Sequence, residues 1–339
     1  ENAKAIGIQA SAFGSGAEAT ARSSLASGFE AKAKGGESVA LGVKSNAEGL
    51  GATAVGPTAN ARGENSAALG RRSKADGSGA MALGGFSQAK SENATAVGFE
   101  AEATAVEASA FGHKAKAAME GATAIGTNAF AKAIDATAVG NKAQAGRNSI
   151  ALGMNANALN SGTVALGTQS FAGQGATVVG TNAKASGKDS TALGRFSEAN
   201  DTDSVALGSF SKTAAAIGTS GIVLANRTYN FAGVVPKGTV SVGSVGAERT
   251  VTNVAAGRIS ATSTDAINGS QLHATNKSIE GLSTTVVANK THYYSVNDGN
   301  VQQDNYNNDG ATGVDAIAAG VNAEAKGDQA TAIGYKAKA

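Results

Sequence analysis

Histidine is the side chain most often used to transfer protons near neutral pH, so the histidines are the first candidates for chemistry. The chain has three, His113, His273 and His292, and they are far apart in a sequence that has no cysteine. We expect His113 in a turn and the other two on or beside a connecting segment, in surface or capping roles. The sequence therefore predicts no catalytic residue and a protein that is not an enzyme.

A glycine-containing stretch, residues 180–188, ends in Gly-Lys and can be compared with a phosphate-binding loop. That loop needs a fixed glycine spacing and a Ser or Thr directly after its lysine. Here the spacing differs and Asp189 follows Lys188. A repeat described below accounts for the glycines, and we predict no cofactor.

A second candidate site lies near the end of the chain. Asn305, Asn307, Asp309 and Gly310 match the opening of a calcium-binding loop. The twelfth position of that loop is Ala316, which cannot supply the required bidentate carboxylate. The sequence therefore predicts no metal site.

These residues belong to a chain organised by a repeat of about fourteen residues. Alanine stands two positions before almost every repeat glycine, with Val178 as the exception. A larger apolar residue stands directly before the glycine, except at Ser27. A fixed period of this size predicts a solenoid. The repeat glycines are Gly14, Gly28, Gly42, Gly56, Gly70, Gly84, Gly98, Gly112, Gly126, Gly140, Gly153, Gly167, Gly180, Gly194 and Gly208.

Within each repeat the small residues alternate with other residues, which is the period of a β-strand. Ala59 and Ala61, like Ser73 and Ala75, stand three and five positions after a repeat glycine. We predict two strands of about five residues and two tight turns per coil. The small residues should point inward, because two strands this close leave no room for Leu or Val between them.

The larger residues before the glycines should then point outward and form an apolar stripe, with one rung per ~4.8 Å. A soluble monomer rarely exposes so large an apolar face. We therefore predict that copies of the chain bury these stripes against one another, with three chains around an axis. The predicted interface residues of the repeat region are Leu41, Val55, Leu69, Leu83, Val97, Ile125, Val139, Leu152, Leu166, Leu193 and Leu207.

Composition supports an elongated chain without a large core. Of 339 residues, 46 are Gly, none is Trp or Cys, only 10 are Phe and 5 are Tyr, and the 42% hydrophobic residues are mostly alanine. The formal net charge of +2 comes from 28 basic and 26 acidic residues spread along the chain, which argues against a nucleic-acid partner. There is no long apolar run, so we expect targeting and membrane-anchoring segments to lie elsewhere in a longer protein.

The chain divides into four predicted parts: 1–218, the repeat array; 219–263, a different β element; 264–290, a helical connector; and 291–339, where the repeat resumes. In the second part, we expect Tyr229 and Phe231 to be core residues. For the connector, Thr264 and Asp265 suggest the start of a helix.

Apolar residues of the connector recur with heptad spacing and predict a short coiled coil that adds to the interface. Asn289 would occupy a polar core position of that coil. The predicted core residues are Leu272, Ile279, Leu282 and Val286.

Charged residues concentrate in the predicted turns. Arg71, Arg72 and Lys74 fall within one coil. By default such residues keep turns solvated and discourage pairing between solenoids. They are also the candidates, though weak ones, for a ligand-binding patch.

Several segments together resemble one protein family. The repeats 38–42 (SVALG) and 204–208 (SVALG) resemble the head repeats of trimeric autotransporter adhesins of Gram-negative bacteria, the YadA-like head. The runs 253–259 (NVAAGRI) and 264–272 (TDAINGSQL) resemble that family's neck. Residues 228–250 are similar to its Trp-ring adaptor, although Tyr229 or Phe231 must replace the absent Trp. The segment 293–297 resembles the motif that leads a stalk back into a head.

The resemblance implies a mainly β fold: a left-handed parallel β-roll head that forms a homotrimer, an adaptor and neck, a short trimeric coiled coil and the start of a second head. It also implies display on the bacterial surface, anchoring in the outer membrane by a C-terminal translocator domain outside this sequence, and adhesion to a host extracellular-matrix protein or cell-surface receptor.

Two other functions are compatible with a β-solenoid. One is an ice-binding or other purely structural solenoid, and ice binding would need an unbroken threonine ladder. The column that holds Thr53 and Thr95 also holds Val39 and Met81. A β-helical acyltransferase has a hexapeptide period, which does not divide fourteen. The neck-like and coiled-coil segments favour the adhesin.

Overall fold

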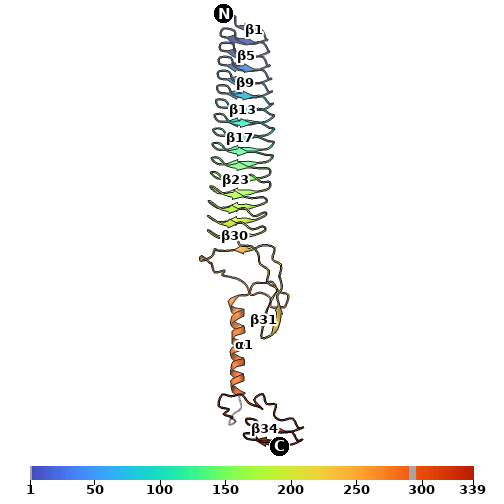
Figure 1. Ribbon diagram of the computed structural model, residues 1–339. Helices are drawn as coiled ribbons and strands as arrows, with labels where there is room; N and C mark the ends of the chain where they lie inside the picture. Colours follow the sequence, from blue (N-terminus) through green and yellow to red (C-terminus); the bar gives the residue numbers. More distant parts are fainter. Residues whose placement is uncertain (1, 290–294) are drawn as a thin grey trace. The chain divides into compact units, whose positions relative to one another are not determined.

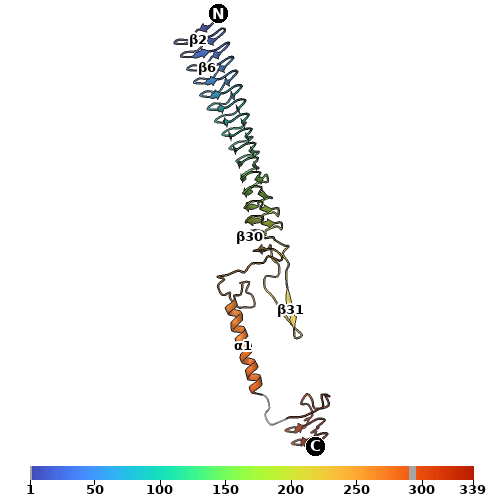
Figure 2. The same cartoon turned by 90° about the vertical axis from the view of Figure 1, so that its left-hand side faces the viewer.

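The computed structural model describes residues 2–289 and 295–339. They form two compact units, residues 1–253 with 259–264 and residues 254–258 with 265–339. The first unit is mainly a β-solenoid, in which each coil adds one short strand to each of two parallel sheets (Figure 1). Figure 2 shows the same stack of coils after a quarter turn.

One sheet is built from three-residue strands and is called the three-residue sheet. It has 16 strands, and its last strand, β33, comes from beyond the repeats and pairs parallel to β30. Its strands are β2 (Ser11–Phe13), β4 (Leu25–Ser27), β6 (Val39–Leu41), β8 (Thr53–Val55), β10 (Ala67–Leu69), β12 (Met81–Leu83), β14 (Thr95–Val97), β16 (Ser109–Phe111), β18 (Thr123–Ile125), β20 (Thr137–Val139), β22 (Ile150–Leu152), β24 (Val164–Leu166), β26 (Thr177–Val179), β28 (Thr191–Leu193), β30 (Val205–Leu207) and β33 (Val240–Ser241).

The other sheet is built from two-residue strands and is called the two-residue sheet; it has 15 strands. They are β1 (Lys4–Ala5), β3 (Glu18–Ala19), β5 (Lys32–Ala33), β7 (Asn46–Ala47), β9 (Asn60–Ala61), β11 (Lys74–Ala75), β13 (Gln88–Ala89), β15 (Glu102–Ala103), β17 (Lys116–Ala117), β19 (Phe130–Ala131), β21 (Gln144–Ala145), β23 (Asn157–Ala158), β25 (Phe171–Ala172), β27 (Lys184–Ala185) and β29 (Glu198–Ala199).

The strands are shorter than the five residues expected from the sequence, because the turns take more of each coil. In the coil around Gly42, the second residue of each turn has a positive φ, which is 59° at Glu37 and 56° at Lys44. Both turns thus use a left-handed corner, even where the residue is not glycine. Two such corners let fourteen residues close a coil.

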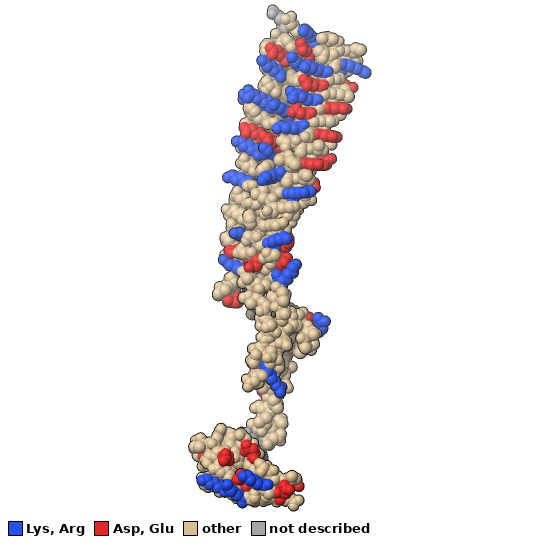
Figure 3. All heavy atoms as spheres, turned by 45° about the vertical axis from the view of Figure 1, so that its right-hand side comes forward, with Lys and Arg blue, Asp and Glu red and all other residues tan. Residues whose placement is uncertain are grey.

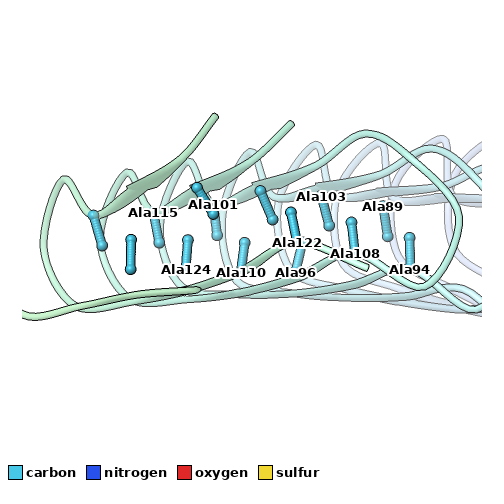
Figure 4. Packing of buried hydrophobic residues seen from close by; sticks show 14 of the residues in the cluster. Ala89, Ala94, Ala96, Ala101, Ala103, Ala108, Ala110, Ala115, Ala122 and Ala124 are labelled. Carbon is cyan, nitrogen blue, oxygen red and sulfur yellow. The ribbon is translucent and has the colours of Figure 1, made fainter. Parts of the chain in front are cut away.

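The core between the two sheets is alanine. Ala96 and Ala110 from one sheet, and Ala89 and Ala103 from the other, are fully buried and point toward one another (Figure 4). Val178 is the largest fully buried side chain. The prediction that small residues fill the coil is confirmed.

Serine shares these inward positions, and its hydroxyl is paired locally. The buried Ser38 hydroxyl donates to the Gly35 carbonyl at 2.6 Å, and the Ser66 hydroxyl donates to the Gly63 carbonyl at 2.7 Å. A buried hydroxyl would be costly without such a partner. Serine therefore fits where alanine does, and it also ties a turn to its strand.

After the repeats come two further β elements. Strands β31 (Gly221–Leu224) and β32 (Arg227–Asn230) form an antiparallel hairpin. Its two loop residues, Ala225 and Asn226, both have positive φ, which matches the right-handed twist of the paired strands.

The only helix in the described ranges, α1 (Gly269–Ala288), begins later than expected from the sequence. Asn268, not Thr264, is its N-cap, and the Asn268 and Gln271 side chains form a reciprocal capping box. Asn289 is the C-cap instead of a core position inside the helix, since α1 ends at Ala288.

The repeat resumes with β34 (Ile317–Ala319) and β35 (Thr331–Ile333), which pair in parallel. Ala323 and Ala325 are buried, as in the first array. The expected stalk-to-head motif begins at Tyr293, and Tyr293 and Tyr294, like His292, lie outside the described residues.

Candidate functional site

The outward face of the three-residue sheet carries the apolar stripe predicted from the sequence. Parallel register stacks each rung on the next, as in Leu41 on Val55 and Leu83 on Val97. Leu41, Val97 and Leu166 are half-buried, whereas Leu152 is 47% exposed and the alanines beside them are fully buried. The side chains therefore lie on the outside of the coil and leave an apolar ladder uncovered in the single chain.

The connector helix also presents apolar side chains. Leu272, Ile279, Leu282 and Val286 lie on α1 and are between 58% and 64% exposed. No residue of α1 is buried in the single chain. A helix with this pattern gains most of its stability from packing of its apolar face.

Two of the three basic candidates lie over one aromatic ring, and the third lines the hollow beside it. The guanidinium carbons of Arg71 and Arg72 each lie 5.5 Å from the ring centre of Phe86, one coil further along. Lys74 lies on β11, and a shallow hollow of about 390 Å³ is lined by Thr58, Arg72, Lys74, Phe86 and Gln88. Phe86 was not among the residues predicted from the sequence, although its position fourteen residues after Arg72 places the two side chains on adjacent coils.

The basic coil carries three cationic side chains close together. Elsewhere in the array, side chains form ion pairs between adjacent coils, as Lys116 does with Glu102 at 2.8 Å and Lys44 with Glu30 at 3.5 Å. Figure 3 shows blue and red side chains in rows along the outside of the stack. Within the described ranges, Arg71, Arg72 and Lys74 have no ion pair, so that positive charge is available to an anionic group.

His113 extends the same row of side chains. Its ring stacks on Phe99 at 5.9 Å, and Phe99 meets Phe86 edge-on at 5.6 Å. His273 lies exposed on α1. Among the residues that the structure describes, no group of three or more His, Cys, Asp or Glu side chains could hold a metal ion.

The two other sequence candidates have structural roles. Gly180 is a repeat glycine in a turn, and Lys188 lies 3.8 Å from Asp189. In the calcium-like segment, the Asn305 side chain accepts from the Gly310 amide and donates to the carbonyls of Ala318 and Gly320. The Asn305 side-chain amide therefore donates to backbone carbonyls at the edge of β34 that does not pair with β35.

The segment before α1 is fastened to the start of the helix. Arg258 contacts the Asp265 carboxylate through two side-chain nitrogens, at 2.7 and 3.1 Å. This contact lowers the pKa of Asp265. The Gln271 side chain donates to the Gly257 carbonyl at 2.6 Å and accepts from the Gly257 amide at 2.9 Å. Gly257, Arg258, Asp265 and Gln271 are called the clamp; their contacts hold the segment before α1 against the start of the helix.

Arg249 closes the last coil of the first array. Its guanidinium donates to the carbonyls of Ser209 and Val242 and to the Ser211 hydroxyl. No sequence pattern singled out Arg249, because its partners lie up to 40 positions away.

The expectation that Tyr229 and Phe231 are core residues is wrong for the single chain. Tyr229 lies on the hairpin strand β32 and is 49% exposed, and Phe231 lies directly after that strand and is 46% exposed.

Within the described part of the chain, no helix combines the length and apolar character needed to cross a bilayer.

Two protein-family models match the chain. The coiled stalk of trimeric autotransporter adhesins matches residues 250–292. The YadA head domain repeat matches residues 5–31, 19–45, 33–59, 47–73, 75–101, 103–129, 145–170, 172–197, 185–211 and 311–337.

Three known proteins are similar to parts of the chain. Autotransporter adhesin BtaE of Brucella suis biovar 1 (strain 1330) is 58% identical over 79 residues, which are 23% of this chain and 11% of BtaE. A C-terminal YadA-like domain from Burkholderia pseudomallei is 52% identical over 32% of this chain and 55% of its own, with a TM-score of 0.30. The collagen-binding domain of the Yersinia adhesin YadA is 24% identical over 82% of this chain and 87% of its own, with a TM-score of 0.21.

The head-repeat model covers more than half of the chain, and the stalk model covers the segment that contains α1. The alanine-filled coils and the clamp before the helix lie within these matched segments. The chain therefore belongs to the trimeric autotransporter adhesins with YadA-type head repeats.

Proposed function

We propose that this chain is part of a bacterial surface adhesin, which attaches to a host extracellular-matrix protein or cell-surface receptor without catalysing a reaction. The observation that carries the proposal is the uncovered apolar ladder of the three-residue sheet in a chain of this family. The ladder favours self-assembly into a rigid rod, which suits reach and repeated contact. The anchor in the outer membrane would be a translocator domain outside this sequence.

The assembly we propose is a homotrimer with parallel chains. Burying Leu83, Ile125 and Leu152 against sister copies would remove their exposed apolar surface from water. The exposed stripe of α1 would pack in the same way, as a three-stranded coiled coil. Three identical copies would raise the avidity of a weak contact.

The parts of this rod follow from the repeat and its interruptions. We propose that residues 1–218 are the first head, 219–263 the adaptor and start of the neck, 264–290 the end of the neck and the stalk, and 291–339 the return to a second head. The local clamp formed by Arg258, Asp265 and Gln271 supports a structural role for the neck.

For the ligand contact, we propose the basic coil with Arg71, Arg72 and Lys74. Its support is the lack of ion pairs on these groups in the described ranges and the hollow beside Phe86. Opposite charge steers a partner toward such a surface and makes its capture depend on salt.

A binding panel with immobilised matrix proteins and host cells tests both parts of this proposal. We expect the parent protein to bind at least one surface and R71E/R72E/K74E to bind it about tenfold more weakly. K32E/K90E/K132E carries the same change in charge on separate coils and should bind like the parent. Equal binding by all three would exclude the basic coil; no binding by the parent to any matrix protein or host cell would contradict adhesion.

The ice-binding alternative is not favoured. In the outward column of the three-residue sheet, Thr53 stacks between Val39 and Ala67, and Thr95 follows Met81. A regular hydroxyl ladder is therefore absent from these rungs.

A further inference from the structure

Each coil of the first array has two turns, and the two rows of turns carry opposite charge. The turns that follow the two-residue strands form the acidic edge, and those that follow the three-residue strands form the basic edge. At the two corner positions of its turns, the acidic edge holds Glu37, Glu64, Glu92, Glu107, Glu120, Asp135, Asp189 and Asp203 against Arg22, Arg147 and Lys188. The positions just before these corners add Glu48, Asp76 and Asp201 and the bases Lys34, Arg62, Lys90 and Lys132, so acidic residues still outnumber basic ones on this edge. The basic edge holds Lys44, Arg71, Arg72, Lys114, Lys142 and Arg195 against Glu30 and Glu100.

The charges on the two edges are also matched in height. Glu37 precedes Lys44 by seven residues, which is half a coil, and the same spacing separates two further acid–base pairs outside the basic coil. Half a coil crosses from one edge to the other with a rise of only ~2.4 Å, half the strand spacing. These further pairs are Glu107 with Lys114 and Asp135 with Lys142.

These groups cannot satisfy one another inside one chain, because the sheets hold the two edges apart. Lys44 contacts Glu30 at 3.5 Å and Lys114 contacts Glu100 at 3.6 Å, both along the basic edge. Among residues 2–289 and 295–339, Glu37, Glu107 and Asp135 have no ion pair. All six side chains of the pairs 37/44, 107/114 and 135/142 are exposed.

We propose that the acidic edge docks against the basic edge of a second copy of this chain, so that the matched charges of neighbouring copies meet. This rests on the proposed assembly around the apolar face, which both edges flank. In copies related by rotation about an axis along the stack, equal residues lie at equal height. Glu37 of one copy then faces Lys44 of the next.

The charge pattern selects orientation and register more than it supplies affinity. Copies running in opposite directions would set acidic edge against acidic edge, and a slip by several coils would break the matches. Exposed ion pairs are individually weak and screened by salt. Their repetition along the stack disfavours every arrangement except parallel chains in register.

Charge reversal on one edge at a time tests the proposal. E37K/E107K/D135K puts basic residues on both edges at the three matched heights, and K44E/K114E/K142E puts acidic residues on both. At low salt we expect each variant to dissociate at a concentration about tenfold higher than the parent in sedimentation equilibrium. The variant carrying all six changes exchanges the charges within these three pairs and should assemble like the parent. In about 1 M NaCl, where screening acts over about 3 Å, the differences should shrink.

A control with the same net change in charge as K44E/K114E/K142E places three reversals on the two-residue sheet: K32E, K116E and K184E together. These residues lie on β5, β17 and β27, away from both edges, and this variant should assemble like the parent. If the parent assembles and the one-edge variants do so equally well at low salt, or the six-fold variant is no better than they are, edge pairing is wrong. A parent that stays monomeric overturns both this inference and the proposed trimer. Residues 71, 72 and 74 are unchanged throughout, so ligand binding is tested separately.

Discussion

At the scale of single residues, the glycine column is explained by the distance between coils. Gly98 has a φ of +135°, and a Cβ there would lie 2.4 Å from the carbonyl oxygen of Gly112 on the next coil. Gly162 also has a positive φ, of +68°, but no atom lies within 4 Å of its Cβ position. Gly98 is needed both for its positive φ and because the next coil leaves no room for a Cβ, whereas Gly162 is needed for its positive φ alone.

This difference predicts the cost of two substitutions. Gly98→Ala should lower the free energy of unfolding by about 3 kcal/mol or more, because backbone of the next coil must move. Gly162→Ala should cost only about 1 kcal/mol, the usual penalty of a left-handed alanine. Denaturant unfolding followed by circular dichroism, at matched protein concentration, measures both. Equal losses would show that coil spacing does not require the glycine column.

The sequence predicted which residues lie inside but not how the corners are made. Alternation was enough to place Ala96 and Ala103 in the core. It could not show that Lys44 and Glu37 adopt left-handed corners, since neither residue type favours that conformation. The predicted strands were therefore too long.

At the scale of elements, the helix start shows where local patterns compete. Thr264 and Asn268 are both suitable N-cap residues. Asp265 is engaged by Arg258, and Gln271 both completes the capping box of Asn268 and holds Gly257. These contacts join residues that are seven and fourteen positions apart, and they favour a helix that starts after Asn268. A capping pattern read from neighbouring residues alone does not reveal such contacts.

The clamp before α1 should depend on pH in a defined direction. Arg258 lowers the pKa of Asp265, so their pairing stabilises the clamp above the ordinary aspartate pKa of about 3.9. That stability is lost as the pH falls through the lowered folded pKa.

Carboxyl-carbon NMR titration checks this prediction. Asp265 should titrate below about 3.9 in the parent and move toward that value in Arg258→Gln. Glu248 is an internal control: its pKa is also lowered, but chiefly by the backbone amide of Gly246, so its midpoint should not move. An Asp265 midpoint that is the same in both proteins would contradict the clamp.

At the scale of the whole molecule, the repeat made the solenoid predictable, whereas long-range contacts were not. A fixed period reports that each coil packs on its neighbour. Arg249 reaches back to Ser209 and Ser211 without any period, so only the structure could identify it. The adhesive surface is harder to predict for a related reason: identical coils present similar surfaces, and only departures such as the basic coil distinguish one.

The central claim is that the apolar ladder on the three-residue sheet is covered by sister copies. The most direct test is the mass in sedimentation equilibrium across a wide range of concentrations. One chain has a mass of 33.0 kDa. We expect a species of three times that mass, which Val97→Asp on the ladder should shift toward single chains and Gln88→Asp on the opposite sheet should not. A parent protein that sediments as single chains at every concentration would contradict the account.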